Sequence, residues 1–255
     1  MSWNPDQYLK FAAPRLQPAI DLLARVPSTH PQTVYDLGCG AGNVTQLLAA
    51  RWPAASITGV DDSAEMLAKA RAATPGVNWV QQSLASWRAP KLADLIYSNA
   101  ALHWLADHQR LFPALVGQLA PGGVLAVQMP RNFGAPSHTL IAETVHCGPW
   151  HSRLEPLLAP SPVAEPAFYY DVLSARVARL EIWETEYLQV LAGPDPVKEW
   201  TKGTWLKQFL DALAEPERSA FEGDYAVRLR QAYPVLPDGN TLFPFRRLFL
   251  LAVAH

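Results

Sequence analysis

Three glycines and two acidic positions in the N-terminal quarter of the chain are spaced to bind a nucleoside-like ligand. An apolar run ends in Asp36 and continues with glycines at alternate positions, Gly38, Gly40 and Gly42. Glycines favour a sharp turn from a strand into a helix, because they accept positive φ and let a ligand approach the backbone. The free N–H groups of the helix that follows would point at that ligand.

The acidic residues indicate which kind of ligand is expected. Dinucleotide-binding turns read G-x-G-x-x-G around a pyrophosphate, whereas this chain reads G-x-G-x-G. Asp36 would repel a diphosphate but can pair with an ammonium group. Asp61 and Asp62 follow the apolar segment 57–60 and are placed to accept hydrogen bonds from ribose hydroxyls. The alternatives are a nicotinamide-binding domain or a fortuitous glycine-rich turn.

Alternating strands and helices are expected to position these residues. The alternation predicts βαβ units and a parallel sheet. Ser63 is a candidate N-cap, and the 121–123 Pro-Gly-Gly segment is expected to be the turn that feeds the fifth strand. The apolar patterns predict helices over 12–25, 43–51, 63–73 and 108–119, and strands over 33–37, 56–60, 77–81, 93–99 and 124–129.

The second half of the chain has a different pattern. Prolines interrupt the stretch after Pro130, and strands are expected over 180–191 and 247–254. The segment 196–232 has helical periodicity, and we interpret it as a helical cap over the mouth of the site. An outer helix layer on the sheet is the alternative. The expected apolar face of this segment consists of Trp200, Trp205, Phe209, Leu213, Phe221 and Tyr225.

Composition limits the partners and the compartment. The chain has 255 residues, a net charge of −2 and 17% charged residues, so no basic surface is expected to collect nucleic acid or anionic membrane. Cys39 and Cys147 are too few for a disulfide framework or a zinc site. No leader-like N-terminus or apolar run of roughly 18 residues is seen. We therefore expect a cytoplasmic monomer or weak homodimer with a small-molecule substrate and no metal.

The acidic-x-Gly-x-Gly-x-Gly turn and the acidic end of the second strand resemble the class I S-adenosylmethionine-dependent methyltransferases. This resemblance implies an α/β, Rossmann-like fold: a seven-stranded, mostly parallel sheet with helices on both faces and a helical cap insertion. It also implies S-adenosyl-L-methionine as cofactor and S-adenosyl-L-homocysteine as product. We expect one methyltransferase domain over 1–255, with a helical segment over the cofactor at 1–30 and the cap at about 194–234.

Other segments resemble the trans-aconitate 2-methyltransferase family over essentially the whole chain. They are the Ser-Trp-Asn-Pro opening at 2–5, the Arg-Trp-Pro-Ala-Ala segment at 51–55, the fifth-strand ending at 123–130 and the Arg-Leu-Phe segment at 247–249. The family implies methyl transfer to one carboxylate of a small tricarboxylate, which gives a monomethyl ester. A carboxylate is already ionised at neutral pH, so no general base is required.

The resemblance also assigns a cofactor site. Family members usually have an acidic residue after the third strand, where this chain has Ser83, so its hydroxyl or the Leu84 backbone N–H is expected to hold the adenine. Asn99 ends the fourth strand and is expected to face the sulfonium, although a helix N-cap is the alternative. The predicted cofactor-binding residues are Asp36, Gly38, Gly40, Gly42, Asp61, Asp62, Met66, Ser83, Leu84 and Asn99.

Cations and polar donors are expected to hold the acceptor, because an Arg binds a carboxylate bidentately and a Lys acts as a point charge. His103 and Trp104 are predicted to act with Asn99 as catalytic residues, with a packed His–Trp pair as the alternative. Arg247 is the strongest acceptor-binding candidate, although Arg246 precedes it where the family has Pro. The predicted substrate-binding residues are Tyr8, Phe11, Arg15, Arg131, Lys202, Lys207 and Arg247.

Three departures from the family pattern bear on the acceptor. Ser83 replaces an acidic residue, Trp205 and Lys207 stand where the family has Gly and Arg, and Arg131 stands where an acidic residue is expected. Three hypotheses therefore stay open. They are a trans-aconitate methyltransferase, a methyltransferase of another small carboxylic acid or hydroxylated metabolite, and a non-catalytic S-adenosylmethionine-binding protein.

Overall fold

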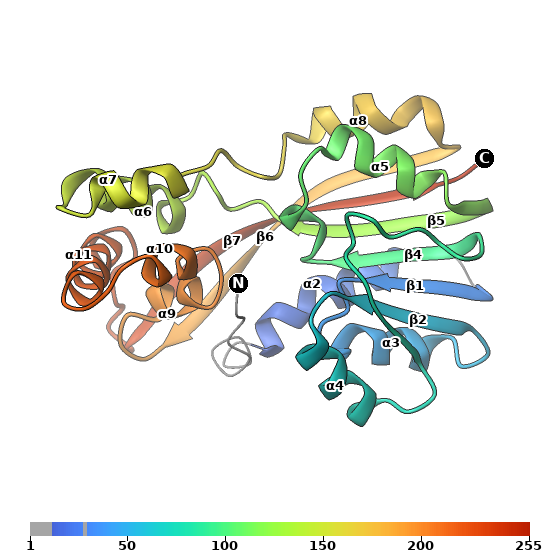
Figure 1. Cartoon of the computed structure of the whole chain (residues 1–255), viewed down its shortest axis with the longest axis horizontal. Helices are drawn as coiled ribbons and strands as arrows, with labels where there is room; N and C mark the ends of the chain where they lie inside the picture. The colour runs from blue at the N-terminus through green and yellow to red at the C-terminus, as the bar shows by residue number, and fades with distance from the viewer. Residues whose placement is uncertain (1–11, 28–29) are drawn as a thin grey trace. The chain divides into compact units, whose positions relative to one another are not determined.

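The computed structural model describes residues 12–27 and 30–255 of the chain, whose main feature is a seven-stranded sheet (Figure 1). The strand order is β3-β2-β1-β4-β5-β7-β6. The pairings among β1 to β5 are parallel, whereas β7 is antiparallel to β5. This architecture confirms the expected mostly parallel α/β fold. The strands are β1 (Thr33–Leu37), β2 (Ser56–Asp61), β3 (Asn78–Gln81), β4 (Ala93–Asn99), β5 (Leu119–Pro130), β6 (Arg179–Ala192) and β7 (Asn240–Val253).

The described residues divide into two compact units. The sheet unit comprises Leu16–Pro130, Pro162–Thr185 and Arg247–His255. The helical unit has Arg131–Ser161 and Glu186–Arg246 as its larger pieces. Strands β6 and β7 each contribute residues to both units. The arrangement of a single domain with a cap over the site stays a prediction.

Helices flank both faces of the sheet in the sheet unit. Figure 1 shows α5 and α8 along one face, and α2, α3 and α4 along the other. The bounds of α2 and α3 match the sequence prediction, and Ser63 caps α4 by accepting a hydrogen bond from the Met66 N–H at 3.3 Å. The helices are α2 (Ala12–Arg25), α3 (Asn43–Arg51), α4 (Ala64–Ala73), α5 (His108–Val116) and α8 (Pro166–Leu173), with short 3₁₀ turns at Leu102–Trp104 and Ser174–Arg176.

The helical unit has an apolar core of its own. Helices α6, α9, α10 and α11 bury apolar side chains together with Leu191 of β6 and with Phe243 and Phe245 of β7. The predicted apolar face of 196–232 lies in this core, and only Trp205 is partly exposed. The helices are α6 (Pro136–Cys147), α7 (His151–Leu154), α9 (Pro196–Lys202), α10 (Lys207–Asp211) and α11 (Glu217–Ala232), with a 3₁₀ turn at Glu155–Leu157.

The starts of two strands differ most from the sequence prediction. Strand β5 already begins at Leu119, and the Pro-Gly-Gly segment at 121–123 lies inside it rather than before it. A register shift absorbs these residues, because Ala93 pairs with Leu119 while Leu95 pairs with Val124. Strand β7 begins at Asn240 instead of 247, since its first half packs into the helical unit through alternate residues.

Candidate functional site

The glycine turn between β1 and α3 has the predicted backbone geometry. Gly38, Gly40 and Gly42 have φ of +76°, +54° and +84°, which L side chains rarely adopt. A Cβ on Gly38 would lie 2.1 Å from the Ala101 Cβ, so a side chain there would collide with the next loop. A Cβ on Gly40 would meet nothing within 4 Å. The turn therefore needs glycines and leaves open space above Gly40.

The two predicted carboxylates border this turn. Asp36 is 1% exposed and accepts a hydrogen bond of 2.6 Å from the Thr45 hydroxyl. Asp61 accepts from the Gly40 N–H at 2.8 Å and from the Ser63 N–H at 3.0 Å, one bond to each oxygen. A carboxylate oxygen has a second lone pair, so Asp61 can still accept from a ligand hydroxyl. These two hydrogen bonds hold Asp61 beside the glycine turn.

Burial raises the pKa of both carboxylates, which makes them weaker acids. The pKa of Asp36 is raised to about 7, mainly by burial; the Thr45 hydrogen bond opposes the shift, and the nearby charge of Asp61 adds to it. The pKa of Asp61 is also raised, mainly by burial, while hydrogen bonds from Ser63 and Gly40 oppose the shift. A cationic group placed beside Asp36 would favour its ionised form.

The remaining predicted cofactor residues lie after β2 and β3. Met66 is half-buried on α4, whereas the neighbouring Asp62 is exposed. The Ser83 side chain is exposed, and its carbonyl accepts from the Ser86 N–H at 3.2 Å. The Leu84 Cδ1 lies 3.5 Å from the Cβ position built on Gly38, so Leu84 borders the glycine turn.

One face of the sheet carries a row of polar side chains near the ends of β4 and β5. Asp36 pairs with Tyr97, and Asn99 pairs with Gln128, so side-chain alternation puts all four on the same face. The Asn99 Oδ1 is buried with no hydrogen-bond partner among the described residues. Asn99 is also not a helix N-cap, because Ala101 occupies that position in the following 3₁₀ turn.

Arg247 of β7 completes this polar row. Arg247 is 4% exposed, and its Nη1 donates to the Gln128 Oε1 at 3.4 Å. Gln128 itself is fully buried and was missed by the sequence analysis. The available signal was a single amide within the apolar run 124–129, which was attributed only to the strand.

His103 and Trp104 stand in the 3₁₀ turn after β4. His103 is 5% exposed and its Nδ1 has no partner in the described part of the chain, whereas Trp104 is 44% exposed. Their ring centroids are 4.6 Å apart. Burial, together with the positive charge of Arg247, lowers the pKa of His103 to about 3, so the imidazole is neutral at pH 7. His103 can therefore act as a neutral polar group near Arg247.

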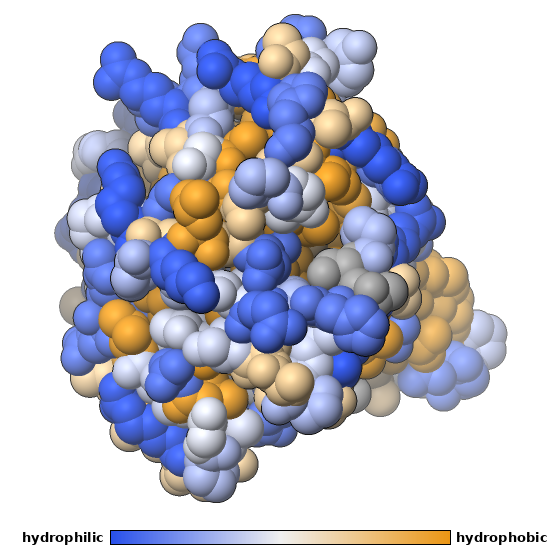
Figure 2. Space-filling view, turned by 90° about the vertical axis from the view of Figure 1, so that its right-hand side faces the viewer, coloured by the Kyte–Doolittle hydropathy of each residue, from blue (hydrophilic) through white to orange (hydrophobic). Residues whose placement is uncertain are grey.

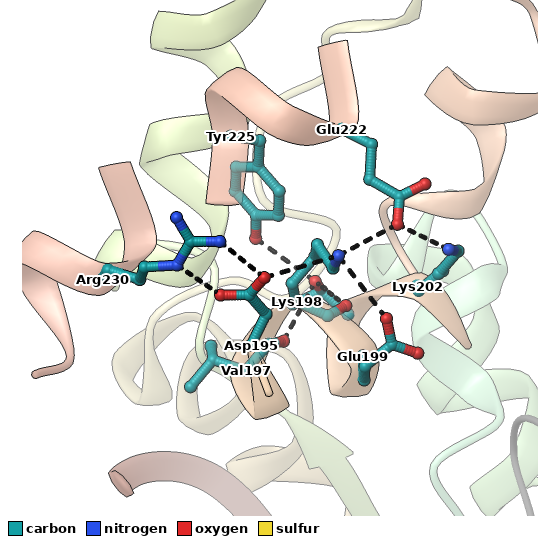
Figure 3. Close-up of polar contacts among 9 residues, drawn as sticks. Asp195, Val197, Lys198, Glu199, Lys202, Glu222, Tyr225 and Arg230 are labelled. Carbon is teal, nitrogen blue, oxygen red and sulfur yellow. Dashed lines mark hydrogen bonds and ion pairs between the residues drawn. The ribbon is translucent and has the colours of Figure 1, made fainter. Parts of the chain in front are cut away.

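Two predicted cations of the helical unit, Lys202 and Lys207, pair with carboxylates, and Figure 3 shows the pair that Lys202 forms with Glu222. Lys202 Nζ lies 2.5 Å from Glu222 Oε1, and Lys198 reaches the same oxygen at 3.2 Å. Lys207 pairs with Asp211 at 2.6 Å. The carboxylates offset much of the charge that an anionic acceptor would use. The predicted roles of Lys202 and Lys207 in acceptor binding are not tested by these contacts.

The other predicted acceptor residues are described only in part. Arg131 is half-buried, and its backbone N–H donates to the Arg246 carbonyl at 2.9 Å. Arg15 lies in α2, but its side chain is outside the described part of the structure. Tyr8 and Phe11 lie outside the described residues altogether.

The sequence predicts neither a membrane-spanning segment nor a metal site. Within residues 12–27 and 30–255, no helix has the length and apolar character needed to cross a membrane. His146, His151 and Glu155 of the helical unit each place one possible ligand atom within 4.8 Å of the others. The expectation of no metal therefore stays a prediction.

Comparison with known proteins agrees with this geometry. Residues 34–123 match a family model described as a methyltransferase domain. The chain is 50% identical to a trans-aconitate 2-methyltransferase of Azoarcus sp. over 99% of both chains. It resembles the crystal structure of a putative methyltransferase of Bacillus halodurans (TM-score 0.59, 14% identity, 93% of this chain and 98% of that one).

A further structural neighbour was solved with a cofactor. It is the Haemonchus contortus phosphoethanolamine N-methyltransferase 2 in complex with S-adenosyl-L-methionine (TM-score 0.56, 16% identity, 94% of this chain and 53% of that one). The strand order, the glycine turn and the methyltransferase-domain match define an S-adenosylmethionine-dependent methyltransferase of class I. Within that class, the chain belongs to the trans-aconitate 2-methyltransferase family.

Proposed function

We propose that this enzyme transfers the methyl group of S-adenosyl-L-methionine to one carboxylate of trans-aconitate and forms its monomethyl ester. The observation that carries the acceptor class is the buried Arg247 beside the neutral His103, on the sheet face that also bears Asn99. A buried guanidinium favours a carboxylate ligand because the two groups match in charge and in hydrogen-bonding geometry. The name of the 50% identical relative supports trans-aconitate.

The residues around the glycine turn fit the cofactor. Gly40 leaves open space, Asp36 can pair with the amino group of the methionyl part, and Asp61 can accept from the ribose hydroxyls. The Asn99 Oδ1, which has no hydrogen-bond partner among the described residues, offers a partial negative charge for a sulfonium. The Leu84 backbone N–H would donate to the adenine, since Leu84 borders the glycine turn. The roles of these residues are part of the proposal.

The chemistry asks little of acid or base groups. When bound, S-adenosyl-L-methionine supplies a methyl group on a positively charged sulfur, and the carboxylate oxygen bonds to this methyl as the sulfur–methyl bond breaks. The reaction transfers no proton. Arg247 would hold the acceptor's charge, and the buried surroundings of His103 would exclude water from the nucleophile. Alignment of reacting groups contributes about 7–11 kcal/mol in the best intramolecular models.

The test is methyl transfer from labelled S-adenosyl-L-methionine to trans-aconitate, cis-aconitate, citrate, isocitrate and unrelated mono- and dicarboxylates. Base-labile volatile label reports ester formation, and a reaction without acceptor is the control. We expect trans-aconitate to give the highest kcat/KM. Ester formation with a different acid would replace the substrate. Cofactor binding with no ester from any acid would refute the proposed acceptor class.

A further inference from the structure

Gln128 places a fully buried amide in the middle of an apolar strand, and burying such a group costs free energy unless it is hydrogen-bonded. A ligand that accepts from the amide would offset this cost. Strand β5 buries Val124 to Met129 without interruption, and Gln128 is the polar residue among them. An unsatisfied buried polar group costs roughly 1–3 kcal/mol. The Gln128 Nε2 is buried and has no hydrogen-bond partner among the described residues.

The orientation of this amide is fixed by its neighbour. Arg247 can only donate, so Gln128 must turn its oxygen toward the guanidinium. The Nε2 then necessarily points elsewhere, and it presents two N–H groups to whatever lies beside the pair. A hydrogen-bond acceptor in that position would satisfy the amide nitrogen.

The amide also leaves the guanidinium charge intact. A Glu of nearly the same shape at position 128 would pair with Arg247 and cancel its charge in a buried place. The Gln holds the Arg through a neutral oxygen instead. The effect of the Arg247 charge on the neighbouring His103 shows that this charge is felt within the polar row.

We infer that Gln128 is a specificity-determining residue for the acceptor: its amide oxygen orients Arg247 without neutralising it, and its amide nitrogen donates to a carboxylate oxygen of the bound acid. This inference rests on the proposed function, since it concerns the same acceptor site. The inference predicts that the enzyme favours anionic acceptors partly through Gln128, although this side chain carries no charge. A group bound there is shielded from water, which strengthens both interactions.

The decisive variant is Gln128→Glu, measured as KM and kcat on tri-, di- and monocarboxylate acceptors with the full chain. We expect the KM of the tricarboxylate to rise about 10- to 100-fold, which corresponds to roughly 1.4–2.7 kcal/mol. The rise should be smaller for dicarboxylates and smallest for monocarboxylates. The affinity for S-adenosyl-L-homocysteine, measured by calorimetry, should change by less than about twofold.

Two further variants keep the test informative. Gln109→Glu adds the same charge at an exposed position of α5 and should leave the KM of every acceptor unchanged. Gln128→Met removes both hydrogen bonds without adding charge, so its KM should rise for all acids with little dependence on their charge. It also reports on the site if Gln128→Glu does not fold.

The outcomes separate this inference from the proposed function. An equal loss of kcat for all acceptors in Gln128→Glu, with unchanged KM ratios, would show a structural role and overturn the inference. A Gln128→Met variant that loses kcat equally for all acceptors and keeps every acceptor KM unchanged would also overturn the inference. Absence of ester formation by the wild-type enzyme would instead refute the proposed function.

Discussion

The two units differ in how their ionic and polar side chains are partnered, although Gln208 of the helical unit also has a buried Nε2 without a hydrogen bond among the described residues. In the helical unit, Glu222 meets both Lys198 and Lys202, and Asp195 receives two hydrogen bonds from Arg230 at 2.7 and 2.8 Å. In the sheet unit, Asn99, His103 and Gln128 each keep a buried polar atom without a partner in the described part of the chain. Charges that satisfy one another hold helices together, whereas unsatisfied polar atoms indicate where a ligand belongs.

The surroundings of the two regions reinforce this contrast. The helical unit encloses an aromatic core that includes Trp200, Phe209 and Phe221. The polar row of the sheet unit lies on strands that are otherwise mostly apolar. Each unsatisfied polar group there costs free energy until a ligand binds. Figure 2 shows hydrophilic and apolar residues interspersed on one face of the molecule, so surface character alone does not locate the site.

The largest effect is expected from Arg247. Replacing it with Met, which keeps much of its length, should raise the acceptor KM about 10- to 100-fold, because a hydrogen bond to a charged group contributes about 1.5–3 kcal/mol. Cofactor affinity should be nearly unchanged in calorimetry. Arg247→Lys keeps the charge and should recover part of the loss. Equal loss of thermal stability in both variants, with no selective rise in KM, would contradict an acceptor role.

Asp61 tests the cofactor side of the same unit. Asp61→Ala should weaken S-adenosyl-L-methionine and S-adenosyl-L-homocysteine alike, by about 10- to 100-fold, since a hydrogen bond to a charged group contributes about 1.5–3 kcal/mol. It also removes the bonds to the Gly40 and Ser63 N–H groups, so Asp61→Asn is the milder companion variant. A change confined to the acceptor KM would place Asp61 outside the cofactor site.

Asp36 should make stability depend on pH. Its folded-state pKa of about 7 lies above the usual value of 3.8, so the native state binds the proton more tightly and is stabilised while Asp36 is protonated. That contribution is lost as pH rises from about 4 toward 7. Asp36→Asn should therefore raise the apo-protein Tm at pH 8 by about 2–8 °C, and by less at pH 5. An identical Tm difference at both pH values would contradict the raised pKa.

The fold was largely predictable because its signals are local. The glycine turn, the Ser63 cap and the apolar strands follow from turn chemistry and periodicity within a few residues. Gln128 was missed because its partner is Arg247, which lies 119 residues away in the chain. The Lys202 partner Glu222 was also missed, because it lies 20 residues away on another helix. The Lys207–Asp211 pair has i,i+4 spacing within one helix and could have been read from the sequence.

The smallest effects are expected in the helical unit, where Lys202 and Lys207 test the contrast directly. The sequence predicts that both bind the acceptor, but each is paired with a carboxylate, and its loss should leave that carboxylate partly solvated. Pairs of this kind contribute about 0–1 kcal/mol. We therefore expect Lys202→Met and Lys207→Met to change the acceptor KM by less than about twofold.

The matched variant for Lys202 is Glu222→Gln, which removes the charge of its carboxylate partner and keeps the lysine. If Glu222 only holds α9 against α11, this variant should lower the Tm by about 1–3 °C and leave KM unchanged. If Lys202 binds the acceptor, freeing its charge should lower the acceptor KM, while Lys202→Met should raise it as strongly as Arg247→Met does. That second pattern would end the contrast between the units, because the helical unit would then supply a substrate-binding cation of its own.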